Sequence, residues 1–226
     1  MLLQRPSTNR TIRKNKEDIS KALQRWLKYV QAWQALNEEG KEQLEAVAQI
    51  LLYLRADAVE TQMGTSEGKE PDEYMNILSQ HWKRIKELVS RLETLLQGMH
   101  RSLYTIETIF GDSLDIVLFA TLPLSQLVKY VRPVNEAFFK ELSCKQQIIS
   151  SFWNYSSRDI LTMLITIWWR QPFIDPVEFD FYVGAVGAEL AVDEYQTLQE
   201  DKEATSPTLS TTSSYSNSEI VSYLLL

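Results

Sequence analysis

The chain has 226 residues, of which 44% are hydrophobic and 23% charged, and its formal net charge is −7. An acidic chain lacks the broad basic surface that nucleic acids bind, so we expect no direct sequence-specific contact with nucleic acid. Cys144 is the only cysteine, which excludes an internal disulfide and a cysteine-rich zinc site. With only 7 glycines and 7 prolines, the chain favours helices over a β-fold with many turns.

Residues 1–15 are predicted to form a disordered basic tail, because arginine and lysine occur there without any acid. A mitochondrial transit peptide shares this bias. The tail of a nuclear protein is favoured, because the amphipathic face of a transit helix is missing. We therefore expect a nuclear protein, with the cytoplasm as a second location. No apolar core of a secretory signal is visible, and the longest apolar stretch, within 164–169, is too short for a bilayer, so no membrane association is expected.

A helical domain is predicted over residues 16–198, and its first helix over Lys16–Leu36. Apolar residues recur there at steps of four and three, which places them on one face. Asn37–Gly40 is interpreted as a stop signal. A second helix is predicted over 44–58, followed by a polar loop, Gly64–Glu70.

The third helix is predicted to run from Pro71 to Phe110, with proline in its first turn. A seam sustained over more than four heptads indicates a helix lying alongside, either in this chain or in a partner. The seam residues are Leu78, His81, Ile85, Leu88, Leu92, Leu95, Met99, Ser102, Ile106 and Ile109.

Three further helices complete the prediction. The fourth begins at Thr121 and Pro123, continues to about Tyr155 and should be kinked by Pro133. The fifth covers 157–169, and the last, capped by Asp175, covers 177–197. Residues 199–226 are Ser/Thr-rich and are predicted to form a disordered tail, in which Ser206, followed by proline, is a candidate phosphorylation site. The predicted fold class is all-α: an elongated antiparallel bundle of coiled-coil hairpins with disordered tails.

The end of the fifth helix is the most specific local signal. Trp168 and Trp169 are adjacent, and Pro172 ends the helix directly after them. Neighbouring side chains on a helix point about 100° apart. One indole can therefore lie in the core while the other faces a second surface. This arrangement serves packing or binding rather than a reaction.

Catalytic patterns are weak in this sequence. His81 and His100 are nineteen residues apart on one helix and have no zinc-ligand spacing with a cysteine or an acid cluster. Cys144 has no neighbouring base that would make it a nucleophile. No glycine-rich phosphate loop occurs. We expect no enzymatic activity, no cofactor and no metal site.

Four separated segments resemble the cyclin-dependent kinase 2-interacting protein family. They keep a similar order and spacing over about 160 residues, and the basic N-terminal tail also fits the family; the second helix and the residues after Leu198 depart from it. The segments are Trp26 with Trp33, Leu36-Asn37 and Gly40; Leu118-Phe119 with Thr121 and Pro123; Lys140-Glu141-Leu142 with Lys145; and Trp168-Trp169 with Gln171-Pro172-Phe173.

The resemblance implies an adaptor in DNA replication and genome maintenance. Its implied partners are cyclin-dependent kinases, replication or checkpoint kinases, and subunits of an AAA-type ATPase assembly that remodels replisome and ribosome-precursor proteins. We take the family-motif residues as candidate partner-binding residues: Trp26, Trp33, Leu118, Phe119, Pro123, Trp168, Trp169, Gln171, Pro172 and Phe173. A helical subunit of a cytoplasmic tethering or cytoskeletal complex is the alternative, because long helical hairpins are also common there.

Overall fold

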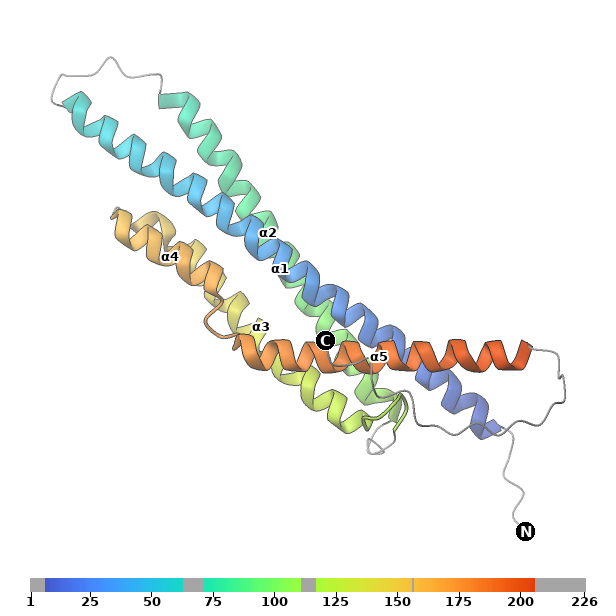
Figure 1. Ribbon diagram of the computed structural model, residues 1–226. Helices are drawn as coiled ribbons and strands as arrows, with labels where there is room; N and C mark the ends of the chain where they lie inside the picture. The colour runs from blue at the N-terminus through green and yellow to red at the C-terminus, as the bar shows by residue number, and fades with distance from the viewer. Residues whose placement is uncertain (1–6, 63–70, 111–116, 156, 206–226) are drawn as a thin grey trace, which may run out of the picture. The chain divides into compact units, whose positions relative to one another are not determined.

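The structure, a computed structural model, describes residues 7–62, 71–110, 117–155 and 157–205 (Figure 1). These residues form five α-helices and one short 3-10 helix, and no β-strand occurs among them. The predicted all-α class is therefore confirmed. The chain divides into two units, Met1–Asp193 and Glu194–Leu226, and the helix packing described below lies within the first.

Helix α1 is longer than predicted, because it runs without interruption from Ser7 to Gln62. The interpretation of Asn37–Gly40 as a stop signal was wrong, since both residues lie inside the helix. Asparagine and glycine disfavour a helix interior by only about 1 kcal/mol or less each relative to alanine, and tertiary packing can override that. The contacts that do so involve the end of α4 and are described below.

Helix α2 spans Pro71–Phe110, as predicted, and packs mainly against α1, alongside which it runs back (Figure 1). The heptad seam thus finds its partner helix inside the chain. The buried set differs from the predicted one, because Leu96 and Leu103 are buried whereas His81, Leu95 and Ile109 are half-buried. A straight helix drifts relative to a strict seven-residue repeat, and α3 also packs against α2, so the buried stripe is displaced.

Helix α3 spans Leu124–Ser151 and continues as the 3-10 helix η1, Phe152–Asn154. Pro123 is its N-cap residue, and Pro133 lies inside it. Helix α4, Arg158–Arg170, folds back against α3 and α1. Helix α5, Pro176–Thr205, begins as predicted at Asp175, whose carboxylate accepts hydrogen bonds from the Val177 and Glu178 amides at 2.9 and 3.2 Å.

The link before α3 is attached to α5 by one buried carboxylate. Val117 and Pro123 form an isolated bridge, and Leu118 and Phe119 between them are buried. Glu189 accepts hydrogen bonds from the Thr121 amide and hydroxyl and from the Leu122 amide, the last two at 2.9 and 2.8 Å. The link is therefore held by directional contacts that its sequence alone does not reveal.

The helices extend past the predicted domain at both ends. Residues 7–15, predicted as part of the basic tail, belong to α1, and residues 199–205, predicted as part of the C-terminal tail, belong to α5. The rest of the two predicted tails, residues 1–6 and 206–226 including Ser206, lies outside the described residues. No described helix combines the length and the apolarity needed to cross a membrane.

Candidate functional site

The turn that follows α4 has an unusual backbone at Gln171. Its φ of 51° lies in the left-handed region, which residues other than glycine rarely adopt. Two side-chain hydrogen bonds stabilise this conformation: Gln171 Oε1 accepts from the Trp33 indole at 2.7 Å, and Nε2 donates to Gln34 Oε1 at 2.8 Å. The turn is thus fixed to the middle of α1 through a residue of the predicted motif.

Trp168 is the buried member of the adjacent tryptophans, as one of the pair was expected to be. Its indole donates to the Asn37 carbonyl of α1 at 3.0 Å and lies against Gly40. A Cβ atom added at Gly40 would be only 2.4 Å from the Trp168 ring. Gly40 therefore does not end α1; it makes room for this indole.

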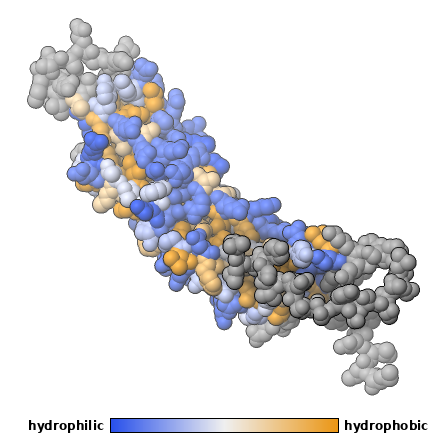
Figure 2. All heavy atoms as spheres, viewed as in Figure 1, coloured by the Kyte–Doolittle hydropathy of each residue, from blue (hydrophilic) through white to orange (hydrophobic). Residues whose placement is uncertain are grey.

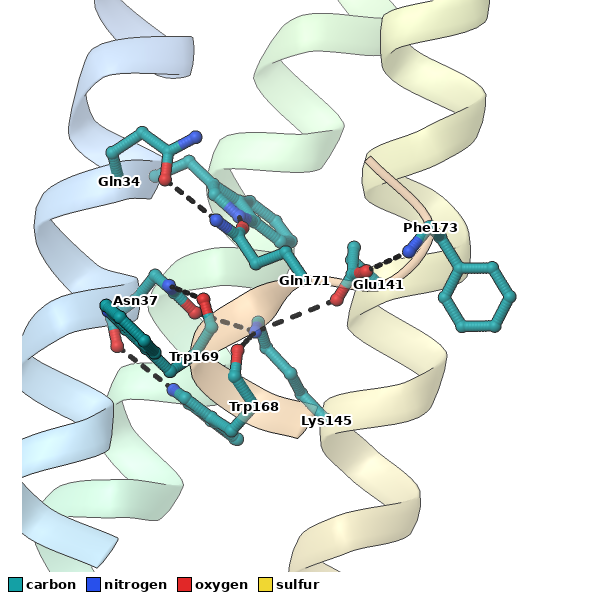
Figure 3. Close-up of polar contacts among 9 residues, drawn as sticks. Gln34, Asn37, Glu141, Lys145, Trp168, Trp169, Gln171 and Phe173 are labelled. Atoms are coloured by element: carbon teal, nitrogen blue, oxygen red, sulfur yellow. Dashed lines mark hydrogen bonds and ion pairs between the residues drawn. The ribbon is translucent and has the colours of Figure 1, made fainter. Parts of the chain in front are cut away.

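Lys145 of α3 connects α1, α3 and the end of α4 (Figure 3). Its ammonium donates to Asn37 Oδ1 and to the Trp168 carbonyl, both at 2.7 Å, and lies 4.6 Å from the centre of the Trp168 ring. The Asn37 amide nitrogen donates in turn to the Trp169 carbonyl at 3.2 Å. We call Asn37, Glu141, Lys145, Trp168 and Gln171 the Lys145 junction.

Glu141 is the acidic member of the junction, one helical turn before Lys145. Both side chains are fully buried, and their charged atoms are 3.8 Å apart. One carboxylate oxygen accepts from the Phe173 amide at 2.6 Å, whereas the other has no hydrogen-bond partner. Burial raises the pKa of Glu141, opposed by the Phe173 hydrogen bond and by Lys145. Burial also lowers the pKa of Lys145 to about 8, opposed by Glu141, so desolvation outweighs the attraction within the pair.

Trp169 faces the other way and is 40% exposed. Its indole donates to Glu38 Oε2 at 3.0 Å, and the Lys41 ammonium and the Arg170 guanidinium each lie 4.9 Å from its ring centre. Such cation–π contacts hold an aromatic ring in place at a surface. The side chain is therefore presented in a fixed orientation.

Hollows of about 600 and 580 Å³ lie on the two sides of Trp169, and together we call them the Trp169 groove. The first, between α1 and α4, is mostly apolar, with Leu52, Leu161 and Ile165 in its lining. The second reaches from Gln34 on α1 to Phe179 on α5. Two hollows beside an oriented tryptophan, the first of them mostly apolar, are suited to holding a protein side chain or a helix.

The structure separates the predicted partner-binding residues into two groups. Six are buried and hold the bundle together: Trp26, Trp33, Leu118, Phe119, Trp168 and Gln171. Pro123 is half-buried at the start of α3, and Trp169, Pro172 and Phe173 are exposed around the turn. Only the exposed group can meet a partner without rearrangement of the fold.

The two N-terminal tryptophans illustrate the first group. Trp26 donates to Asn135 Oδ1 at 2.8 Å, and the Asn135 amide donates to the Met99 carbonyl at 3.3 Å. Trp33 lies 4.6 Å from Phe138, between ring centres, in addition to its bond to Gln171. Their seven-residue spacing therefore serves contacts of α1 with α3 and with the turn after α4.

Asn135 and the structural roles of Asn37, Gly40, Lys145 and Glu189 were missed by sequence reasoning. One signal was available at Lys145. The predicted inner face of α3 steps from Phe138 to Leu142 and then to Ile148, and position 145 is where the next inward residue belongs. A lysine at an inward position indicates a buried polar contact, but the residues that accept its hydrogen bonds, Asn37 and Trp168, lie on other helices.

The two residues considered for chemistry, His81 and Cys144, lie outside the set of residues that form the Lys145 junction. His81 Nδ1 is 2.8 Å from Gln43 Oε1, which is a helix-to-helix contact between α2 and α1. Cys144 is half-buried, and burial raises the pKa of its thiol. Within the described ranges, no group of three or more histidine, cysteine, aspartate or glutamate side chains is placed to hold a metal ion.

Comparison with known proteins gives one distant similarity. No family model matches the sequence. The cyclin-dependent kinase 2-interacting protein of Mus musculus is 21% identical over 166 residues, which cover 66% of this chain and 77% of that protein. This degree of identity is that of a distant relationship.

Proposed function

We propose that this chain is a non-enzymatic nuclear adaptor whose Trp169 groove binds a protein partner. The observation that supports this most directly is the opposite placement of the two adjacent tryptophans. Trp168 is fixed in the Lys145 junction, and that attachment sets the position of Trp169 at the surface. A rigid, exposed tryptophan flanked by cations and by a mostly apolar hollow has the character of a binding hot spot.

The choice of partner comes from the relative. Its name states that it interacts with cyclin-dependent kinase 2, so a kinase of this class is the first partner to test. The wider family resemblance adds replication or checkpoint kinases and subunits of an AAA-type ATPase assembly. In this proposal the chain links such proteins during DNA replication and genome maintenance, with the kinase contact in the groove.

A direct test is a titration of purified cyclin-dependent kinase 2 against wild-type chain and Trp169→Ala. We expect Trp169→Ala to weaken binding by about 2 kcal/mol, roughly 30-fold, because truncating a hot-spot tryptophan typically costs that much. The matched control is Trp153→Ala, since Trp153 is 39% exposed but packs against Trp82 at the far end of α3. The control should bind like wild type.

If wild type and Trp169→Ala bound the kinase equally, the Trp169 groove would not be the binding site. If neither wild type nor the two variants bound it, cyclin-dependent kinase 2 would not be the partner. Location tests the rest: a tagged chain should accumulate in the nucleus. A chain found instead on vesicles or microtubules would favour a tethering or cytoskeletal complex.

A further inference from the structure

One side of α5 exposes a continuous row of apolar residues. Val177, Phe181, Gly184, Ala188 and Val192 follow one another at steps of four and three, so they share a face, which we call the α5 face. Val177 is 77%, Phe181 59% and Val192 44% exposed, and none of the five residues lines the Trp169 groove. Figure 2 shows apolar residues in orange at several places among hydrophilic residues in blue on the face in view.

The opposite side of α5 already carries the contacts that hold the helix on the bundle. Val186 and Leu190 are buried there, and Glu189 binds the link before α3. A surface helix needs only one apolar stripe to pack on a core. Phe181 also lies edge-on against Tyr130 of α3, with 5.6 Å between the ring centres, but the rest of the α5 face forms a second apolar stripe beyond the one that packs on the bundle. Such exposed patches mark interaction sites.

The glycines of α5 support this conclusion independently of exposure. Gly40 on α1 is required by internal packing, because Trp168 occupies the space of its Cβ. At Gly184 and Gly187, by contrast, an added Cβ would meet nothing within 4 Å. Glycine is less favourable than alanine in a helix interior, so its presence without an internal neighbour needs an external reason. Close approach of a second helix is such a reason, because glycine allows it.

The charges around the α5 face indicate what kind of helix fits. The exposed carboxylates of Glu178 and Asp180 flank the row, and no lysine or arginine occurs between Pro176 and Asp193. A second copy of α5 would place the same acidic sequence opposite itself, which is unfavourable. A partner with lysine or arginine beside its apolar stripe would instead be attracted.

We propose that the α5 face is a docking surface for a basic amphipathic helix of a partner protein. The partner's apolar stripe packs over Gly184 and Ala188, between the larger side chains of Phe181 and Val192. Its lysine or arginine residues lie beside Glu178 and Asp180. The first unit thus has two separate binding surfaces, as an adaptor requires.

The test begins with a photo-reactive benzoylphenylalanine placed at Ala188 of the full chain in cells. The control carries the same residue at Gln97, an exposed position of α2. Mass spectrometry of the cross-linked peptides should identify, at position 188 only, a segment of another protein with an apolar stripe flanked by lysine or arginine. The cross-linked segment is then synthesised and titrated against purified chain.

The peptide should bind wild type more weakly as salt increases, and Gly184→Leu should raise its Kd at least tenfold. The thermal midpoint of Gly184→Leu should be equal to or higher than that of wild type, because leucine favours a helix more than glycine does. Gln97→Leu, which adds an exposed leucine elsewhere, should leave the Kd unchanged.

Several results would overturn the proposal. One is a cross-link from position 188 to a second copy, which mixing isotopically light and heavy chains would reveal. Others are cross-links to residues 206–226 of the same chain or to an acidic segment of another protein. A cross-linking yield at position 188 no higher than at position 97 would also overturn it. A marked fall in the thermal midpoint of Gly184→Leu would also overturn it, because the glycine would then serve the fold.

Discussion

The seam between α1 and α2 and the Lys145 junction are both buried, but their side chains contribute in different ways. Along the seam, Ile85, Leu88 and Leu92 are fully buried and need only apolar neighbours of suitable volume. At the junction, Lys145 and Asn37 are buried with hydrogen bonds that have one correct geometry. Apolar packing tolerates exchange of similar side chains, whereas a buried polar network fixes one arrangement.

This difference explains how the surface beside the junction is set. The seam holds α1 and α2 together over their length, and heptad spacing alone would accept neighbouring registers. Polar contacts beside the seam, such as His81 with Gln43 and Arg84 with Glu39, favour the observed one. The junction has hydrogen bonds from α1 to α3 and to the turn after α4, so only one alignment of these helices satisfies it. Trp169 and Phe173, which lie directly beside these bonds, are positioned as a result.

Substitution of one residue by methionine in each region should give the largest difference in stability between the junction and the seam. Lys145→Met should cost about 3–5 kcal/mol of unfolding free energy, because it leaves the Glu141 carboxylate buried without its cation. It also leaves Asn37 Oδ1 and the Trp168 carbonyl without their donor. Leu92→Met should cost less than about 1.5 kcal/mol, since it conserves volume in an apolar site. Denaturant unfolding of both variants measures the two values.

A double variant controls for the charge. Glu141→Gln added to Lys145→Met should recover part of the loss, because glutamine is neutral and can still accept from the Phe173 amide. Equal costs for Lys145→Met and Leu92→Met would contradict the distinction between the regions.

The two regions also differ in how far the sequence predicts them. The seam was predictable because its residues repeat along one helix, and α2 begins and ends where proline and the heptad pattern indicate. The junction was not, because its contacts to α1 join residues more than one hundred positions apart, such as Asn37 with Lys145 and with Trp168. Local rules interpreted Asn37 and Gly40 as a helix end, since those residue types usually disfavour a helix.

The turn after α4 was predicted from the sequence in part, less fully than the seam and better than the junction. Adjacent tryptophans before a proline predicted one buried and one exposed indole, and Trp168 and Trp169 show that division. Periodicity could not say which indole is buried, because that depends on the space that Gly40 leaves on α1. The family-motif residues were predicted as one group, yet most of them hold the fold rather than face a partner.

Substitution of Gly40 by alanine tests whether the Trp168 indole needs the space that this glycine leaves. Gly40→Ala should destabilise the chain by about 1–3 kcal/mol, because the new methyl group would overlap the indole and force it to move. Gly187→Ala is the matched control on α5, where the Cβ meets no atom, and it should be neutral or stabilising by up to about 1 kcal/mol. Thermal unfolding of both variants gives the comparison. A Gly40→Ala chain as stable as wild type would show that Trp168 can shift without loss.

The smallest expected effect is a rise in stability at alkaline pH that originates from Lys145. In the unfolded chain this lysine keeps its proton up to its ordinary pKa of 10.5, whereas in the folded chain burial lowers that pKa to about 8. The unfolded state therefore binds more protons between these values, and the unfolding free energy increases as pH rises through about 8. Between pH 7 and pH 9 the gain should be about 1 kcal/mol.

The apolar seam contains no such group, so Leu92→Met should keep this gain and Lys145→Met should lose it. Lys145 also lowers the pKa of the neighbouring Cys144 thiol, so both variants should carry Cys144→Ala, and only the difference between their pH profiles counts. Parallel profiles for the two methionine variants would mean that Lys145 does not change its charge in this range.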